Sequence, residues 1–237
     1  MTLSIDPDPA TPSSEGPATA NPAEPHAHRV RNTAIGICVL ATLLGVLAVL
    51  ASRADTSVAS WHGQVLPSPQ RIPDIRLTDT DGEPFSLIDD TPGDLTLLMF
   101  GYTNCPDICP ISLGTLAAAL DELGPDVANR VDMVFVTADP DRDDLGPLRT
   151  YLDGYDPEFI GLRGTATEIA EAQDLAKVPR AVIETPDDDG GYIVGHATQI
   201  IAYQDDGTAR IAYPFGTRSQ DWINDIPRLL AGEIPDE

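Results

Sequence analysis

A ten-residue segment with two cysteines and two prolines, Gly-Tyr-Thr-Asn-Cys-Pro-Asp-Ile-Cys-Pro at residues 101–110, constrains the fold of this chain more than any other part. It follows the apolar run Leu95–Phe100, whose length and composition are typical of a buried strand in a parallel sheet. It precedes residues 111–123, where leucines and alanines recur at helical spacing up to Gly124. The cysteines are therefore expected where a central strand leads into a helix, which is where open α/β sheets bind ligands.

Cys105 and Cys109 are four residues apart, so a first helical turn that includes both would place them on one face, about 6 Å apart along the axis. That spacing suits either a disulfide or two thiolates that bind one metal ion. Because a helix N-terminus stabilises a thiolate, both sulfurs are expected to be more reactive than an ordinary buried cysteine. Pro106 and Pro110 argue against the remaining alternative, in which the two cysteines only fill the core.

Charge and cysteine content narrow the classes of function. The chain carries 38 acidic residues against 14 basic ones, a net charge of −24, which argues against nucleic-acid binding and favours a well-solvated surface. Of the three cysteines, Cys38 lies in an apolar segment, so Cys105 and Cys109 form the only pair. A single close pair is not a disulfide scaffold and indicates redox chemistry or metal binding.

The N-terminal part is expected to anchor the chain in a membrane. Residues 1–32 are rich in Pro, Ala, Ser and Thr, and are expected to form a disordered cytoplasmic tail. Residues 33–51 contain no charge and are long enough to cross a bilayer as a single helix. Arg29 and Arg31 before this segment, against Arg53 after it, favour a cytoplasmic N-terminus and a main domain outside the cytoplasm. A cleaved signal peptide is the alternative, which the long polar leader disfavours.

Residues 52–70 are interpreted as a linker, and residues 71–233 as the folded domain. Strands are expected at residues 75–78, 85–87, 95–102, 131–138 and 159–162, the first two joined by a turn at Asp81-Gly82. Helices are expected at residues 111–123, 147–154 and 165–176, the last opened by the capping box of Thr165 and Glu168. A β-meander (residues 182–183, 192–194, 199–203 and 210–213) and an amphipathic helix (219–231) follow. This order, with the position of the cysteines, predicts an α/β, thioredoxin-like fold.

His196 is the candidate for a third ligand. In a thioredoxin-like fold, the loop that enters strand 199–203 runs beside the redox cysteines, so His196 is expected to reach the same site. Two thiolates and one imidazole form a soft donor set that suits copper or zinc. A structural zinc site needs four ligands, and the only evident fourth candidate is Asp139. Three donors with an open position suit an ion that is to be passed on, which favours copper.

Four segments resemble the Sco/SenC family of membrane-anchored, thioredoxin-like copper chaperones for cytochrome c oxidase assembly. They are the cysteine segment, Thr-Ala-Asp-Pro-Asp-Arg-Asp at 137–143, Phe-Ile-Gly-Leu-Arg-Gly at 159–164 and Gly-His-Ala-Thr at 195–198. The resemblance spans residues 71–230 and implies that Cys105, Cys109 and His196 bind copper, as Cu(I) or Cu(II), with Asp139 in a supporting position. It further implies a metallochaperone rather than an enzyme, which serves the copper-site subunit of cytochrome c oxidase or reduces that subunit's cysteines.

Two positions depart from the family pattern. Gly195 stands where the family commonly has Asp, and Asn104 stands where an aromatic residue or His is frequent. The missing acidic neighbour removes one means of orienting the histidine. The alternative function is a thiol–disulfide oxidoreductase that works through a Cys105–Cys109 disulfide without a metal. A peroxidase is disfavoured, because the loop before Cys105 offers no arginine to activate the thiol.

Overall fold

The computed structural model describes residues 42, 60–184 and 191–235. The expected tail and the expected membrane span, residues 33–51, lie outside this part of the chain, with the exception of Thr42. None of the helices in the described part is long and apolar enough to span a membrane. A compact unit begins at Ser60, and it contains all of the elements below.

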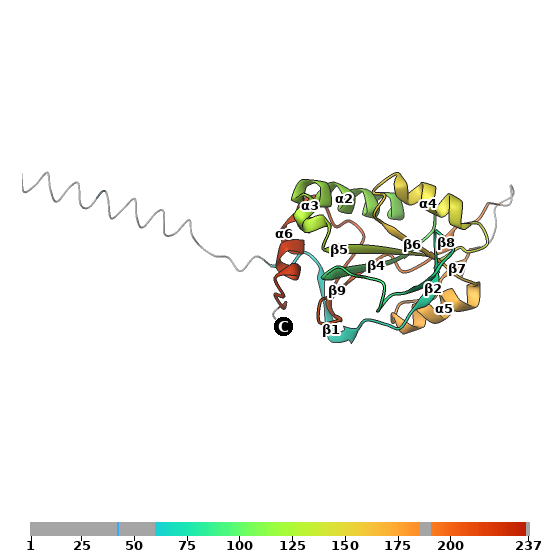
Figure 1. Ribbon diagram of the computed structural model, residues 1–237, viewed down its shortest axis with the longest axis horizontal. Helices are drawn as coiled ribbons and strands as arrows, with labels where there is room; N and C mark the ends of the chain where they lie inside the picture. The colour runs from blue at the N-terminus through green and yellow to red at the C-terminus, as the bar shows by residue number, and fades with distance from the viewer. Residues whose placement is uncertain (1–41, 43–59, 185–190, 236–237) are drawn as a thin grey trace, which may run out of the picture. The chain divides into compact units, whose positions relative to one another are not determined.

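An eight-stranded mixed sheet forms the centre of this unit (Figure 1), with the strand order β1-β10-β9-β4-β5-β6-β2-β3. Its strands are β1 (Gln64–Arg71), β2 (Arg76–Asp79), β3 (Pro84–Ser86), β4 (Leu95–Gly101), β5 (Val131–Thr137), β6 (Ile160–Arg163), β9 (Ile200–Gln204) and β10 (Thr208–Tyr213). Strand β4 is buried along its whole length, pairs in parallel with β5 and pairs antiparallel with β9. Its continuous apolar sequence reflects burial on both faces.

Helices cover both faces of the sheet. They are α2 (Ile108–Leu123), α3 (Pro125–Ala128), α4 (Leu145–Asp153), α5 (Ala166–Leu175) and α6 (Ser219–Leu230). Figure 1 shows α2 and α4 over one face and α5 on the other. Alternate residues of β4 therefore enter two different cores, since successive side chains of a strand point to opposite faces. Leu97 and Met99 belong to the core with α2, α4 and α6, and Leu98 and Phe100 to the core with α5.

Several predicted local features are confirmed. The hairpin between β2 and β3 turns at Gly82, whose φ of 88° needs a glycine. Thr165 and Glu168 form the expected capping box at the start of α5. Helix α2 begins at Ile108 rather than at residue 111, because Pro110 lies in its first turn, where no backbone hydrogen bond is lost.

The expected linker, residues 52–70, includes residues that form a strand of the central sheet. Residues 64–71 form β1, which pairs antiparallel with β10 along one edge of the sheet. Pro67 and Pro69 obscured this strand in the sequence pattern, but an edge strand tolerates prolines because one of its sides makes no ladder hydrogen bonds. The pairing also shifts register between Val65 and Gln70, around the prolines.

The expected four-stranded β-meander is wrong as a single unit. Strands β9 and β10 belong to the central sheet, whereas β7 (Val182–Ile183) and β8 (Val194–Gly195) form a separate two-stranded sheet. Glu184 continues this hairpin by donating its backbone N–H to the carbonyl of Ile193 at 2.9 Å. The hairpin leads directly into His196, so its placement matters for the site.

Candidate metal centre

Three segments that are far apart in the sequence meet at one edge of the sheet. Strands β4 and β5 are parallel, so the segments that follow them, with Cys105 after β4 and Asp139 after β5, emerge at the same edge. Strand β9 runs antiparallel to β4, with Ile200 opposite Met99. The segment before β9 therefore arrives at that edge and brings His196 to the cysteines.

The structure brings the three expected ligands together. The sulfurs of Cys105 and Cys109 and a ring nitrogen of His196 lie within 4.8 Å of one another. The Cys109 Sγ to His196 Nε2 distance is 3.7 Å, both cysteines are buried free thiols, and the histidine is half-buried. Within the described residues, this is the only cluster of His, Cys, Asp or Glu with a geometry that could hold a metal ion.

Cys105 lies just before α2 rather than in its first turn. The N-cap of the helix is Asp107, and Cys109 is the second helical residue. The backbone N–H of Cys109 donates to Cys105 Sγ at 3.4 Å, so the exposed amide groups of the helix N-terminus still stabilise a thiolate. The two cysteines therefore do not lie on one face of a helical turn. Instead, the turn before α2 places the Cys105 sulfur over the N-terminus of the helix.

The two sulfurs differ in acidity. The hydrogen bond from the Cys109 thiol is the largest of the contacts that lower the pKa of Cys105 to about 4, and the backbone N–H of Cys109 adds to it. The same hydrogen bond, together with burial, raises the pKa of the Cys109 thiol far above its ordinary value. Without a metal, the site therefore holds one thiolate, at Cys105, and one thiol, at Cys109.

A glycine lets the end of β4 pass close to the site. A Cβ at Gly101 would lie 2.7 Å from Cys109 Sγ and 2.6 Å from the ring of Phe135. Both distances are below van der Waals contact, so any larger residue would displace the sulfur or the ring. The glycine that opens the cysteine segment thus allows Cys109 to pack against the end of β4.

The backbone orients His196. Its Nδ1 lies 2.7 Å from the carbonyl oxygen of Ala197, which can only accept, so Nδ1 carries the proton and donates it. The lone pair of Nε2 then faces the sulfurs, as a metal ligand requires. Gly195 offers no acidic side chain to the imidazole, and the carbonyl of Ala197 is the acceptor that fixes the protonated nitrogen. The ring of Tyr102 meets the imidazole edge to face, with centroids 5.6 Å apart.

Asp139 does not belong to the ligand cluster. Its buried carboxylate forms an ion pair with Arg142 and accepts a hydrogen bond of 3.0 Å from the Tyr192 hydroxyl. The carboxylate of Asp139 therefore contacts Arg142 and Tyr192 rather than the two sulfurs or the imidazole. The sequence assigned no role to Arg142, although it lies in the quoted segment 137–143, or to Tyr192, which begins the expected strand 192–194.

Asp143 is a second buried carboxylate that sequence reasoning missed. It accepts hydrogen bonds from the backbone N–H of Thr103 at 2.9 Å, from the Thr103 hydroxyl at 2.6 Å and from the Thr137 hydroxyl at 2.7 Å. These bonds hold the loop between β4 and Cys105 against the end of β5. The acidic run after β5 was the available signal, but its spacing does not tell which carboxylate turns inward.

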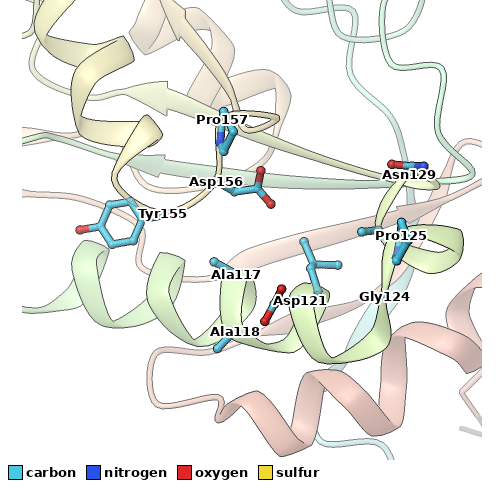
Figure 2. Close-up of a pocket in the computed structure, with 11 residues that line it drawn as sticks. Ala117, Ala118, Asp121, Gly124, Pro125, Asn129, Tyr155, Asp156 and Pro157 are labelled. Carbon is cyan, nitrogen blue, oxygen red and sulfur yellow. The ribbon is translucent and has the colours of Figure 1, made fainter.

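Two cavities differ in their relation to the site. One, of about 560 Å³, lies between α2, α3 and residues 155–157, and Figure 2 shows the carboxylates of Asp121 and Asp156 at its walls. None of the three ligands lines it. A smaller cavity of about 240 Å³ borders Cys105 and His196, with Ile193 among its walls. The ligand cluster is therefore open to the surface on this side.

Comparison with known proteins identifies relatives of this architecture. The SCO1/SenC family model matches residues 67–231. The SCO2-like protein of Rickettsia conorii is 36% identical over 168 residues, which cover 68% of this chain and 80% of that protein. The copper-bound structure of Bradyrhizobium japonicum ScoI has a TM-score of 0.60 and 32% identity, and covers 68% of this chain and 99% of its own. Copper-bound Arabidopsis thaliana ScoI has a TM-score of 0.60 and 26% identity, and the match covers 73% of this chain and 99% of that one. The predicted α/β, thioredoxin-like fold is confirmed by these likenesses.

Proposed function

This chain belongs to the SCO1/SenC family, and we propose that it is a copper metallochaperone that binds one copper ion through Cys105, Cys109 and His196. The observation that carries the proposal is the convergence of two sulfurs and one correctly oriented imidazole nitrogen within 4.8 Å. The copper-bound structures of ScoI from Bradyrhizobium japonicum and Arabidopsis thaliana, which this chain resembles, support the choice of metal.

The donor set favours copper over zinc. A structural zinc site is closed by four protein ligands, and the only fourth candidate from the sequence, Asp139, is committed to Arg142 and Tyr192. Two soft thiolates and an imidazole accept Cu(I), and the imidazole also suits Cu(II). The ion needs the Cys109 thiol to release its proton, which the charge of the bound metal would favour.

An open side makes the ion transferable. Cys105 and His196 border the 240 Å³ cavity, so an incoming ligand from a partner can approach the metal without unfolding the site. We propose that the copper is cargo, delivered to the copper-site subunit of cytochrome c oxidase. The family resemblance supports this partner.

The domain layout completes the proposal. Residues 1–32 would form a cytoplasmic tail, residues 33–51 a single transmembrane helix, and the compact unit from Ser60 onward would stand outside the cytoplasm on the cell membrane. The uncharged span and the arginines around it support this orientation.

A thiol–disulfide oxidoreductase is the second candidate, and the unequal acidity of the two sulfurs favours it. The Cys105 thiolate would attack a partner's disulfide and form a mixed disulfide, releasing one partner thiolate. Cys109 would then lose its proton and attack the Cys105 sulfur, which releases the second partner thiolate. The partner gains two electrons, and this chain is left with a Cys105–Cys109 disulfide.

A copper titration of the full chain in detergent distinguishes the two functions. The reduced protein is expected to bind one copper ion tightly, to lose it when Cys105 and Cys109 are oxidised, and to bind it much more weakly after His196→Ala. His62→Ala, which changes a histidine outside the cluster, serves as the matched control and should bind copper normally. If the reduced chain binds no copper, yet reduces a peptide disulfide without needing His196, the oxidoreductase is the correct function.

A further inference from the structure

Arg142 joins the two loops that flank the ligand cluster. Its guanidinium forms an ion pair with the buried Asp139 and donates from Nη1 to the backbone carbonyl of Tyr192 at 3.0 Å. The guanidinium carbon lies 3.6 Å from the centre of the Tyr192 ring and 5.6 Å from that of Tyr102. One side chain from the loop after β5 thus binds the backbone and the ring of a residue that precedes His196 in the chain.

Tyr192 is held at both ends. Its hydroxyl donates to Asp139 Oδ1 at 3.0 Å, while its ring stacks on Arg142 and its carbonyl accepts from the same guanidinium. Cation–π stacking with a planar guanidinium and a charge-assisted hydrogen bond act together here. We call the three side chains Asp139, Arg142 and Tyr192 the tyrosine clamp.

Tyr192 of the tyrosine clamp lies four residues before His196. The chain between them, β8, pairs only with β7, and this two-stranded sheet shares no strand pairing with the central sheet. After His196, the chain enters the central sheet at β9. The pairing of β9 with β4 fixes the C-terminal side of the histidine. In the described residues, the tyrosine clamp is what ties the other side of the histidine to the loop after β5.

Arg142 also contacts the wall against which the imidazole rests. Tyr102, which lies 5.6 Å from the guanidinium carbon, is the residue whose ring meets His196 edge to face. The burial of Tyr102 leaves that ring little freedom to move. Arg142 therefore contacts both Tyr192, which lies four residues before His196, and Tyr102, whose ring packs against the imidazole.

We propose that Arg142 is a positioning residue for the His196 ligand, acting through Tyr192 and Tyr102. It keeps the imidazole at the distance and angle at which Nε2 can reach an ion held by the two sulfurs. The inference rests on the proposed copper function, because it concerns the same site. Residues that orient a metal-bound histidine without touching the metal typically change metal affinity by roughly 10- to 100-fold when they are replaced.

Copper affinity of Arg142→Met in the full chain tests the inference, with Cu(I) measured by chelator competition and Cu(II) by the nitrogen hyperfine signal. Methionine keeps an unbranched apolar stem but removes the charge, the hydrogen bonds and the planar stacking of the guanidinium. Roughly a 10- to 100-fold loss of affinity and a weakened nitrogen signal are expected. Arg142→Lys should recover part of the loss, because lysine keeps the charge but not the planar fork. Tyr192→Phe, which removes only the hydroxyl bond to Asp139, should show a smaller loss.

Arg163→Met is the matched control. Arg163 holds the same loop after β5 by donating to the carbonyls of Asp143 and Pro140 at 2.9 and 2.8 Å, but none of these bonds involves the β7–β8 hairpin. It should bind copper with the affinity of the unchanged protein and retain the nitrogen signal. A general loosening of the loop would instead affect Arg163→Met and Arg142→Met alike.

Combining Arg142→Met with His196→Ala shows whether the arginine acts through the histidine. In the His196→Ala background, the additional change is expected to have no further effect on copper affinity. An equal loss of copper affinity in both backgrounds would overturn the inference. A normal copper affinity and a normal nitrogen hyperfine signal in Arg142→Met would also overturn it. If Arg142→Met does not fold, Arg142→Lys and Tyr192→Phe decide in the same way, and normal affinity in both refutes it. Absence of copper binding by the unchanged reduced chain would refute the proposed function itself.

Discussion

Cys105 and Cys109 illustrate how two identical side chains acquire different chemistry from their positions at a helix end. Cys105 accepts hydrogen bonds from the Cys109 thiol and backbone, and Cys109 is enclosed by the core. The sequence indicated that both sulfurs would be activated, because both lie near a helix N-terminus. The structure assigns the activation to Cys105 alone, because a hydrogen bond between two thiols has one donor and one acceptor.

The acidity of Cys105 predicts an unusual pH profile of alkylation. With the pKa lowered to about 4, the thiolate persists as the pH falls and is lost only when the pH approaches that value. In metal-free Cys109→Ser, which keeps a hydrogen-bond donor, the rate of reaction of Cys105 with iodoacetamide should be nearly flat between about pH 5.5 and 8. Mass spectrometry of the cysteine peptide measures it. A rate that rises about tenfold per pH unit over this range would contradict the prediction, and Cys109→Ala should move the profile toward that behaviour.

The ligand set itself was predicted residue by residue, whereas its surroundings were not. Cys105, Cys109 and His196 were expected as metal ligands, and the structure brings them together. Arg142 and Tyr192 escaped sequence reasoning because an arginine in an acidic loop and a tyrosine near a turn have no distinctive spacing.

At the scale of elements, the sequence predicted helices and strands well where the hydrogen bonds that define them join residues close together in the chain. The capping box at α5 is an example, since Thr165 and Glu168 satisfy each other's backbone N–H groups within one turn. Strand β1 is the opposite case. Its pairing depends on β10, and its prolines remove the local pattern that would have indicated a strand.

Loss of the cap should cost stability without affecting the ligand cluster. Thr165→Ala removes the side chain that accepts from the backbone N–H of Glu168, and is expected to lower the free energy of unfolding by about 1 kcal/mol. Thr165→Ser, which keeps the hydroxyl, should remain close to the original stability. Urea unfolding of the metal-free protein measures both. Because α5 packs on the face opposite α2, a change in copper affinity would contradict this separation of the two faces.

At the scale of the whole compact unit, its first residues are joined to its last helix. His62 donates its backbone N–H to Asp225 Oδ2 at 2.9 Å, and its ring Nδ1 lies 2.9 Å from Asp225 Oδ1. The hydroxyl of Tyr213, whose pKa is raised by burial, donates to the same carboxylate at 3.1 Å. The neighbouring Trp61 stacks on Arg228 of α6, with the guanidinium carbon 3.9 Å from its ring. Asp225 is fully buried, so these donors are what make its position tolerable.

Breaking this connection should destabilise the whole unit. His62→Ala leaves the carboxylate of Asp225 without its ring partner and is expected to lower the free energy of unfolding by about 1–3 kcal/mol. His196→Ala removes a histidine whose ring makes no contact with a buried carboxylate, and should cost less. Thermal or urea unfolding of the metal-free variants provides the comparison. Equal losses for the two variants would show that the connection to Asp225 carries no special weight.

The sequence by itself determined the order of elements, the strand-to-helix position of the cysteines, the turn at Asp81-Gly82 and the three residues, Cys105, Cys109 and His196, that the fold brings together. These features depend on neighbours within one turn or one strand, or on residue types that few other functions require. Only the tertiary structure decided the rest: the pairing of β1, the separate β7–β8 sheet, the proton on His196 Nδ1 and the tyrosine clamp. Its contacts join residues 50 positions apart in the clamp, 87 in the ligand cluster and 163 between His62 and Asp225. Such pairs are set by how the sheet closes, and no local pattern in the chain records which partner each residue meets.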